Sequence, residues 1–303
     1  MNKITTTKDV QGLLGSENIK NRLQEILGRN AATFTTSVLQ IVKSNSMLAE
    51  CEPNSVVGAA MTAATLNLPL NNSLGFAYIV PYNQKQANGT YNKVAQFQIG
   101  YKGFIQLGQR SGQYKTINVS EVKQGELAYV DFLTGETEFN WLPRDSKRAS
   151  LPTIGYVGYI ELLNGFRKSW YMTIDELNIH GKKYSKTFGN QYGLWATDFD
   201  SMASKTVIKL LLSKYGPLSV DSNMALAVQA DQAMITDPED INEAVYLDNE
   251  VVKVDPDKER TVNLIQLADT QEELDLARDS EYGEELLDLI KAKQKELNLK
   301  AKK

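Results

Sequence analysis

Apolar positions recur at helical spacing over the first part of the chain. Ile19 and Leu23 begin one such stretch, and a second runs from about 35 to 49. A third stretch, 56–66, is rich in Ala and Thr, whose small side chains let helices approach closely. The pattern predicts that residues 1–70 are helical, with apolar faces that fit either an intramolecular core or a contact between subunits.

From residue 76 the apolar period shortens to two, which is typical of strands. Two Asn-Gly pairs, Asn88-Gly89 and Asn164-Gly165, have the turn chemistry of tight hairpins and predict antiparallel pairing across each of them. The predicted strands are 76–80, 94–99, 116–122, 126–131, 136–141, 154–163 and 166–172.

Two longer helices are predicted after residue 98. One lies within 98–114 and ends at Gly112, because glycine favours the left-handed turn that closes a helix. The other begins beside Asp198 and runs to about Lys214, where Gly216 and a proline stop it.

Two capping boxes mark the starts of further helices. Thr173 with Glu176 predicts a short helix through Ile179, followed by a basic loop at 181–186. Thr270, followed by glutamates, predicts another helix start near the C-terminal end.

The predicted fold class is α+β. A helical region, 1–70, precedes an α+β region, 71–235, in which a central mixed β-sheet and packed helices form a basic groove. These two regions form one core, 1–235. Acidic residues and prolines dominate 236–262, which is expected to be a flexible linker, and 263–303 is expected to be a small acidic helical domain.

Charge is distributed unevenly over the 303 residues, although the net charge is only -4. Residues 1–79 carry 6 basic and 5 acidic side chains, 80–216 carry 17 and 11, and 217–303 carry 10 and 21. A basic centre followed by an acidic end is typical of a protein in which one part binds nucleic acid and another binds a protein. The polar N-terminus and the lack of an apolar run of 18 residues predict an intracellular protein with no membrane partner.

The usual catalytic and metal-binding patterns are missing. His180 is the only histidine, and Cys51 is the only cysteine, which excludes an internal disulfide and a thiolate metal cage. No G-x-x-x-x-G-K-[ST] loop occurs, so no ATP site of that kind is predicted. Asp198 and Asp200 have the chemistry to bind magnesium, but carboxylates beside a helix start are more often caps. We therefore predict no catalytic residue, no metal site and no cofactor, with magnesium neither supported nor excluded.

A surface that binds nucleic acid is the interpretation that remains. No carboxylate occurs from Pro53 to Ser120, and on a helix Lys102 and Arg110 share one face with Gln106. Tyrosines between the cations suit a polyanion whose bases stack, and stacking contributes about 1–3 kcal/mol per base with little dependence on sequence. A solvated amphipathic helix in a domain that is basic by chance fits the same residues. The candidate DNA-binding residues are Tyr101, Lys102, Phe104, Gln106, Arg110, Lys115, Arg144, Lys147, Arg148, Lys182, Lys183, Lys186, Trp195, Ser201, Lys205, Thr206 and Lys209.

Two motifs resemble the RecT family of phage single-strand annealing recombinases. The first reads Q-I-G-Y-K-G-F-I-Q-L-G-Q-R-S-G at Gln98–Gly112. The second reads W-x-T-D-F-D-S-M-A-S-K-T-V-I-K at Trp195–Lys209, and Pro81-Tyr82 lies upstream of both. The resemblance spans roughly residues 55–235 and shows no departure within the motifs.

The resemblance implies a compact α+β core, distantly related to lambda Red beta, that anneals complementary strands without ATP. It also implies rings or helical filaments in the cytoplasm of a bacterial host cell, contact with single strands and nascent duplex, and cooperation with a phage exonuclease. Some members of the family are helped by magnesium. A host single-strand binding protein is a further candidate partner for the acidic end. By resemblance, the residues near the DNA are Tyr101, Lys102, Phe104, Gln106, Arg110, Lys205, Thr206 and Lys209.

The mechanism expected from these residues is a continuous positive trough in the centre of the chain. Cations at Lys102, Arg110, Lys205 and Lys209 would hold the phosphates while the base edges stay open to a second strand. Two other classes remain open: a magnesium nuclease that uses the two aspartates beside the long helix, and a passive coat for single strands.

Overall fold

The structure is a computed structural model that describes residues 7–85, 90–185, 187–191, 193–218, 223–235 and 244–246, together with 265, 268, 270–278, 287, 290, 291, 293, 294 and 297. The chain divides into two compact units, 1–249 and 250–303. The smaller unit contains helix α13 (Gln271–Arg278), whose buried side chains pack with Ile265 and Ile290. This helix begins directly after the predicted capping residue.

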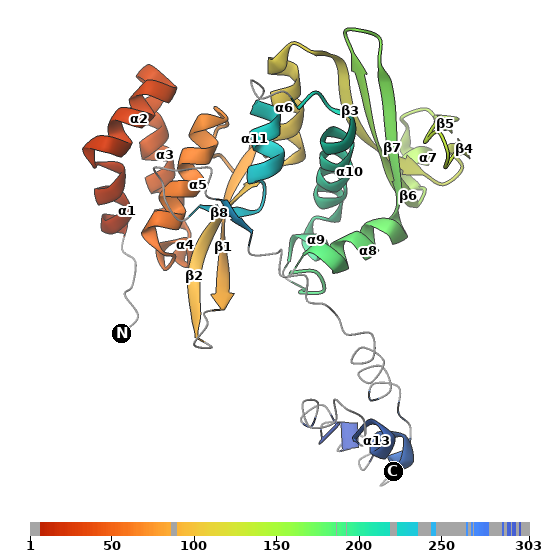
Figure 1. The fold of residues 1–303 in the computed structure, drawn as a ribbon. Helices are drawn as coiled ribbons and strands as arrows, with labels where there is room; N and C mark the ends of the chain where they lie inside the picture. The colour runs from red at the N-terminus through yellow and green to blue at the C-terminus, as the bar shows by residue number, and fades with distance from the viewer. Residues whose placement is uncertain are drawn as a thin grey trace. The chain divides into compact units, whose positions relative to one another are not determined.

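The N-terminal helices of the larger unit pack around α5, which lies at the centre of its core (Figure 1). Residues 55–64 are all buried, because Ala, Gly, Ser and Thr side chains let neighbouring elements pack closely. Pro53 occupies the first turn of α5, and the Glu52 side chain accepts a hydrogen bond from the Ser55 N–H at 3.2 Å, which fixes the helix start. The helices are α1 (Thr7–Leu14), α2 (Glu17–Leu27), the 3₁₀ helix η1 (Gly28–Asn30), α3 (Ala31–Ser44), α4 (Ser46–Ala49) and α5 (Pro53–Thr65).

Strands β1 (Ala77–Lys85) and β2 (Tyr91–Ile99) form an antiparallel hairpin after these helices. The Asn88-Gly89 turn predicted for this hairpin lies outside the described residues. Helix α6 (Tyr101–Ser111) follows β2 at once and ends at Gly112 with φ +65°, as its sequence predicts.

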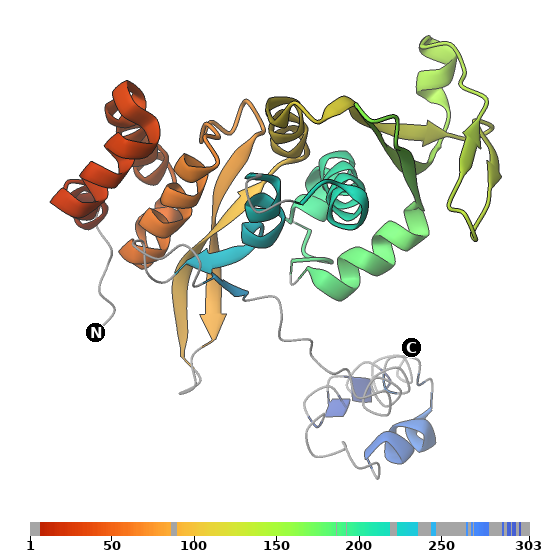
Figure 2. The same ribbon diagram turned by 45° about the horizontal axis from the view of Figure 1, so that its top comes forward.

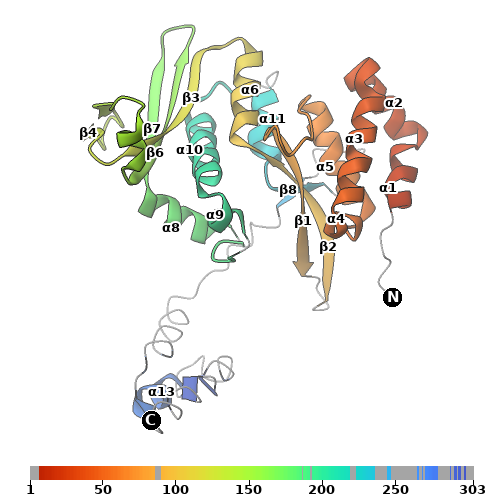
Figure 3. The same ribbon diagram turned by 180° about the vertical axis from the view of Figure 1, so that it is seen from behind.

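A three-stranded antiparallel sheet of order β3–β6–β7 forms the other half of the larger unit, and α10 packs against it (Figure 3). Between β3 and β6 the chain leaves the sheet as an arm, residues 124–152, in which β4 pairs with β5. The elements are β3 (Tyr114–Lys123), β4 (Leu127–Val130), β5 (Thr137–Phe139), α7 (Ser146–Ser150), β6 (Thr153–Leu162), β7 (Arg167–Thr173), α8 (Ile174–Tyr184), α9 (Leu194–Thr197) and α10 (Phe199–Tyr215).

The last segments of the larger unit join its two halves. Figure 2 shows α11 (Asn223–Ala230) between the β1–β2 hairpin and α10. The Gln232 N–H then donates to the Phe97 carbonyl at 3.0 Å, and β8 (Ala233–Ile235) pairs with β9 (Ala244–Tyr246). Strand β9 lies within the range predicted as a linker, most of which is outside the described residues.

The α+β class is confirmed. The described strands form separate antiparallel sheets, so the expected single mixed sheet is a correction. The Asn164-Gly165 hairpin is confirmed, and Gly165 has φ +88°. Helix α8 continues past its predicted end, because Gly181 does not break it: a Cβ at this position would lie 2.5 Å from the Phe188 ring. The glycine permits a close contact inside the fold. Among the helices described, none combines the length and hydropathy that a membrane crossing needs.

Gly103, like Gly181, permits a close contact because it has no side chain. The contact lies where α6 crosses the first hairpin, and it can be tested. A Cβ at Gly103 would lie 2.2 Å from the Phe76 carbonyl oxygen and 2.6 Å from Ile99 Cγ1. Alanine improves helix propensity by about 1 kcal/mol, but the backbone oxygen cannot turn away as a flexible side chain does. We expect Gly103→Ala to lower the free energy of unfolding by about 1–3 kcal/mol in denaturant titrations.

The matched control is Gln109→Ala on the exposed face of the same helix, which should change stability by less than about 0.5 kcal/mol. Equal stability of the two variants would show that α6 does not rest against the hairpin as described.

Candidate nucleic-acid interface

Two neighbouring hollows of the larger unit share Met202 and Lys205 in their linings, and together they are here called the trough. The first hollow, of about 490 Å³, lies between the β1–β2 hairpin, the start of α6 and the start of α10. The second, of about 360 Å³, lies between α8, α10 and the segment that precedes β8. The trough is lined by Asn72, Ser73, Gly75, Tyr78, Val80, Gln98, Ile99, Gly100, Tyr101, Lys102, His180, Gly181, Tyr184, Ser185, Leu194, Trp195, Asp198, Ser201, Met202, Lys205, Thr206, Lys209, Leu210, Ser213, Asp231 and Gln232.

A buried ionic cluster lies in the wall of the second hollow. The Asp231 side chain is fully buried, and its two oxygens lie 2.9 Å from Lys205 Nζ and 2.7 Å from Lys209 Nζ. The same carboxylate accepts a hydrogen bond from the Ile99 N–H at 3.0 Å. Because Lys205 and Lys209 are one turn apart on α10, a single carboxylate contacts both. Within the part of the chain that the structure describes, two ammonium groups contact this one carboxylate.

These charges set the ionisation of the neighbouring groups. Burial by itself would raise the pKa of Asp231, but Lys205 and Lys209 outweigh it and hold that pKa below its ordinary value. Burial, with smaller contributions from Lys209 and Lys183, lowers the pKa of His180. We infer that the imidazole is neutral near pH 7 and lines the trough as a polar aromatic ring.

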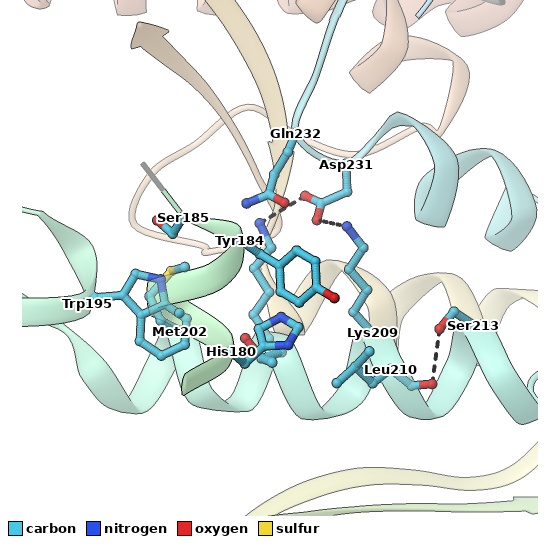
Figure 4. A pocket seen from close by; sticks show the side chains of 13 residues that line it. His180, Tyr184, Ser185, Trp195, Met202, Lys209, Leu210, Ser213, Asp231 and Gln232 are labelled. Atoms are coloured by element: carbon cyan, nitrogen blue, oxygen red, sulfur yellow. Dashed lines mark hydrogen bonds and ion pairs between the residues drawn. The ribbon is translucent and has the colours of Figure 1, made fainter. Parts of the chain in front are cut away.

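Aromatic rings of α8 stand beside the ionic cluster (Figure 4). His180 and Tyr184 are one turn apart, with ring centroids 4.6 Å from each other, and Tyr184 is 47% exposed. Trp195 and Met202 lie at one side of this hollow, and Leu210 lies at the other (Figure 4). Tyr184 is therefore the accessible ring of this hollow on which a base could stack.

The first hollow combines tyrosines with the start of a helix. Tyr101 and Lys102 begin α6, whose first turn has no acidic residue, so its N-terminal partial charge and the Lys102 ammonium favour an anion. Tyr78 lies in the same wall, and burial, with Asp198 and Tyr101 nearby, raises its pKa. Its hydroxyl therefore remains a neutral donor. The lining of this hollow thus offers two lysines, Lys102 and Lys205, one carboxylate, Asp198, two tyrosine rings and neutral polar groups.

Several motif residues are placed differently from what the sequence predicts. Phe104 is 0% exposed in the core, and Thr206 is 7% exposed on the packed side of α10, so neither presents its side chain freely to solvent. Arg110 donates from Nη1 to the Asn67 carbonyl at 2.8 Å and from Nη2 to the Leu66 carbonyl, where α5 ends. Phe104 and Thr206 are therefore corrections, because both are packed inside the fold, whereas the Arg110 side chain is exposed and also joins α6 to the end of α5.

Trp195 is also a correction, since it is 7% exposed. Its ring makes edge contacts with Phe188 and Phe199, each at a centroid distance of 5.6 Å, so its faces are covered by protein. Lys205 is 6% exposed and Lys209 is half-buried, and both contact the buried Asp231 carboxylate, so these two lysines form an ionic seam inside the fold.

The remaining candidate cations lie outside the lining of the trough. Lys115 pairs with Glu161 at 2.9 Å, and Arg148 pairs with Glu126 at 2.6 Å and with Glu121 at 3.1 Å. Burial would raise the pKa of Glu126, but its hydrogen bonds with Arg148 and the backbone hold it below the ordinary value. Arg148 thus ties the arm to the sheet, which corrects its predicted role at a free basic loop. The other expected residues are Gln106, half-buried on α6; Arg144 and Lys147, exposed on the arm; Lys182 and Lys183, exposed at the end of α8; Ser201, half-buried in the trough; and Lys186, outside the described residues.

The two aspartates weighed as magnesium ligands have structural partners. Asp198 caps α10 by accepting from the Ser201 N–H at 3.3 Å, and Asp200 accepts a hydrogen bond from the Tyr156 hydroxyl. Within the residues that the structure describes, no three His, Cys, Asp or Glu side chains are grouped to hold a metal ion. Cys51 is buried, which raises the pKa of its thiol to about 12.

Sequence reasoning missed Asp231, Tyr78, His180 and Tyr184 as parts of one site. Asp231 stands 22 residues after Lys209 in an Ala-Asp-Gln sequence with no motif, so nothing local reveals its partners. Tyr184 had one available signal, since it follows two lysines in the predicted basic loop at 181–186.

The ionic cluster predicts a large effect of Asp231→Asn. The substitution leaves two lysines without their carboxylate in a buried site, and breaking such a pair costs about 3–5 kcal/mol of unfolding free energy. Because the folded-state pKa of Asp231 lies below its ordinary value of 3.8, its contribution is present above that pH and is lost as the pH falls through the folded-state pKa. We expect the stability difference between wild type and variant to shrink in acid, as followed by urea unfolding at several pH values.

Glu138→Gln, at an exposed position of β5, is the control and should change stability by less than about 0.5 kcal/mol. A difference between wild type and Asp231→Asn that is small at neutral pH, or constant down to low pH, would contradict the cluster.

Comparison with known proteins agrees with the two motifs. The model of the RecT family matches residues 32–246. An uncharacterized protein of Bacillus subtilis (strain 168), YqaK, is 46% identical over 218 residues, which cover 72% of this chain and 70% of YqaK. Protein RecT of Escherichia coli (strain K12) is 27% identical over 235 residues, 77% of this chain and 84% of that protein. The family match covers α3 to β9 and both walls of the trough, and this chain belongs to the RecT family of single-strand annealing recombination proteins.

Proposed function

We propose that this protein pairs complementary DNA single strands without ATP, and that the trough holds the sugar-phosphate backbone. The observation that carries this proposal is the pair of neighbouring hollows, with Lys102 in the lining of one and the Lys205–Asp231–Lys209 cluster in the wall of the other. Their linings hold three lysines and two aspartates beside tyrosine rings, which suits a polyanion with stacking bases. Neutral polar groups make up much of the remaining wall, which suits recognition that ignores sequence.

The paired lysines support binding in a specific way. Asp231 holds both ammonium groups in place before DNA arrives, so little side-chain entropy is lost when a phosphate approaches. An ammonium group has three donors, so at Lys209 the ion pair with Asp231 leaves capacity for an anion. The Asp231 carboxylate also repels a phosphate. The cluster therefore contributes less to the affinity for DNA than two free lysines would.

Annealing in this proposal uses the pairing energy of the strands themselves. Phosphates bound at Lys102 and at the α6 start, with bases stacked near Tyr101 and Tyr184, leave the other base edges for a second strand. The protein needs no fuel, because duplex formation is favourable once both backbones are partly neutralised. Residues outside the trough have secondary places in the proposal: Lys182 and Lys183 extend its positive rim, and Arg144 and Lys147 contact a flanking strand.

The proposed partners are single strands, the nascent duplex and further copies of the chain in a ring or filament. An exonuclease that produces the single strand and a single-strand binding protein are proposed to meet the acidic C-terminal unit. Its removal should then leave annealing of naked strands in vitro unchanged and lower recombination in cells.

One experiment separates this proposal from its alternatives. Two complementary strands labelled with a fluorophore and a quencher are mixed with the full chain, without ATP, and with or without magnesium. Faster quenching with intact strands on a denaturing gel supports annealing. Cleaved strands would identify a nuclease, and slower pairing than in buffer would identify a passive coat.

Lys102 provides a quantitative test of the trough. For single strands, each phosphate contact contributes about -0.7 to the slope of log affinity against log salt. We expect Lys102→Gln to weaken binding of all sequences alike and to make this slope shallower by about 0.7, as measured by fluorescence anisotropy at several salt concentrations.

Lys43→Gln is the matched control, because Lys43 is an exposed lysine on α3, away from the lining of the trough. Its slope and affinity should equal those of the wild type. A Lys102→Gln slope equal to that of the control would remove Lys102 from the interface.

A further inference from the structure

Two adjacent apolar residues at the tip of the arm are almost fully exposed. Phe132 and Leu133 have 93% and 94% of their surface in solvent, the highest values among the large exposed apolar residues described. They lie side by side in the turn between β4 and β5. An aromatic and an aliphatic side chain together on one protruding turn form a typical anchor for a partner.

The tip is held in one conformation although its side chains are exposed. The Leu133 N–H donates to Asp131 Oδ1 at 2.8 Å, and the Gly135 N–H donates to the Asp131 carbonyl at 2.7 Å. Gly135 adopts φ +66°, which glycine accommodates without strain, and Lys168 of β7 donates to the Thr134 carbonyl. A preorganised anchor loses little conformational entropy when it is buried.

A neutral groove of about 310 Å³ is present among the N-terminal helices. Leu27 of α2 and Phe34 of α3 form one wall, and Leu68 and Leu74 of the segment after α5 form the other. None of the side chains that line it is charged. Leu74 is 44% exposed at its mouth, so an apolar side chain entering the groove would cover it.

The tip and the groove lie at opposite ends of the larger unit. Figures 1 and 3 show α1 to α3 at one end and β4, β5 and α7 at the other, with the elements of the trough between them. The tip therefore cannot enter the groove of its own chain. A contact between two different surfaces of identical chains is heterologous, and it repeats until it closes a ring or extends a filament.

We propose that the Phe132–Leu133 tip of one copy of this chain inserts into the groove lined by Leu27, Phe34, Leu68 and Leu74 of the next copy. Charges beside the two surfaces favour this pairing: Asp131 and Glu136 flank the tip against one cation there, Lys168, and exposed Arg29 adjoins Asn30 in the groove wall. Like charges beside the tip and the groove would repel each other. The opposite charges of Glu136 and Arg29 instead attract, and this attraction orients one copy on the next.

The proposed contact is physically connected to the trough. Arg110 near the end of α6 holds the Leu66 and Asn67 carbonyls, directly before Leu68 of the groove. The other end of α6 carries Tyr101 and Lys102 in the trough. Insertion of a tip thus presses on a segment fixed to the helix that lines the trough. The contact deepens the proposed function, because it places the troughs of successive copies one after another along the assembly. The binding of DNA in those troughs rests on the proposed function, whereas the contact between copies does not.

The test uses the full chain without DNA, so its result is independent of annealing. The tip variant is Phe132→Ser with Leu133→Ser, and the groove variant is Leu74→Glu, all at exposed positions. Leu163→Ser, at the 69% exposed tip of the β6–β7 hairpin, is the matched control. Thermal unfolding should show that all variants are folded, and sedimentation velocity measures their assembly.

Wild type and control should self-associate equally, and each of the tip and groove variants should lose more than about tenfold in association constant. An equimolar mixture of the two variants should form dimers and nothing larger, because each mixed pair retains one intact tip and one intact groove. Wild-type protein that stays monomeric, a variant that assembles like the control, or a mixture that stays monomeric or forms longer assemblies would each overturn the contact.

A charge exchange provides a second, independent measurement. Glu136→Arg and Arg29→Glu should each weaken self-association, and the double variant should restore it. If the double variant is as weak as the single variants, Glu136 and Arg29 do not face each other and the proposed orientation is wrong.

Discussion

The buried carboxylate of Asp231 is the constraint on which the candidate site depends. A carboxylate taken out of water is tolerated only with charged partners and hydrogen-bond donors around it, and here two lysines of α10 and the Ile99 N–H of β2 supply them. Those partners come from the two halves of the larger unit. The cluster therefore fixes the position of α10 against the first hairpin, and the trough is the space between these elements.

Not all basic side chains in the centre of the chain are available to bind DNA. Several cations of the centre neutralise protein carboxylates: Lys115 with Glu161, and Arg148 with Glu121 and Glu126. These pairs leave the net charge of residues 80–216 unchanged, but they occupy some of its 17 basic side chains, so fewer are left for a polyanion. The capacity to bind DNA rests on where the remaining cations and rings lie. A buried pair can be neutral for stability and still fix geometry, and here it keeps two ammonium groups beside an open hollow.

The larger unit is asymmetric from end to end, with an apolar groove among its N-terminal helices and a protruding apolar tip on its arm. An elongated ligand such as a DNA strand is longer than one trough, so sites on successive copies must follow one another in the same direction. Two unlike surfaces at opposite ends satisfy this requirement, because the contact between them preserves direction. A self-complementary contact would reverse direction at every second copy.

The sequence by itself determined much of the succession of elements and the α+β class, because helical periodicity, Asn-Gly turns and capping boxes act between neighbours in the chain. It also indicated the family through two motifs. The structure alone decided which motif residues face solvent: Phe104 and Thr206 are packed, Arg110 holds the end of α5, and Lys205 and Lys209 meet a carboxylate. The reason is that exposure and ion pairing depend on how distant segments pack, and the Asp231 contact with Lys209 joins residues 22 positions apart with no local signal between them.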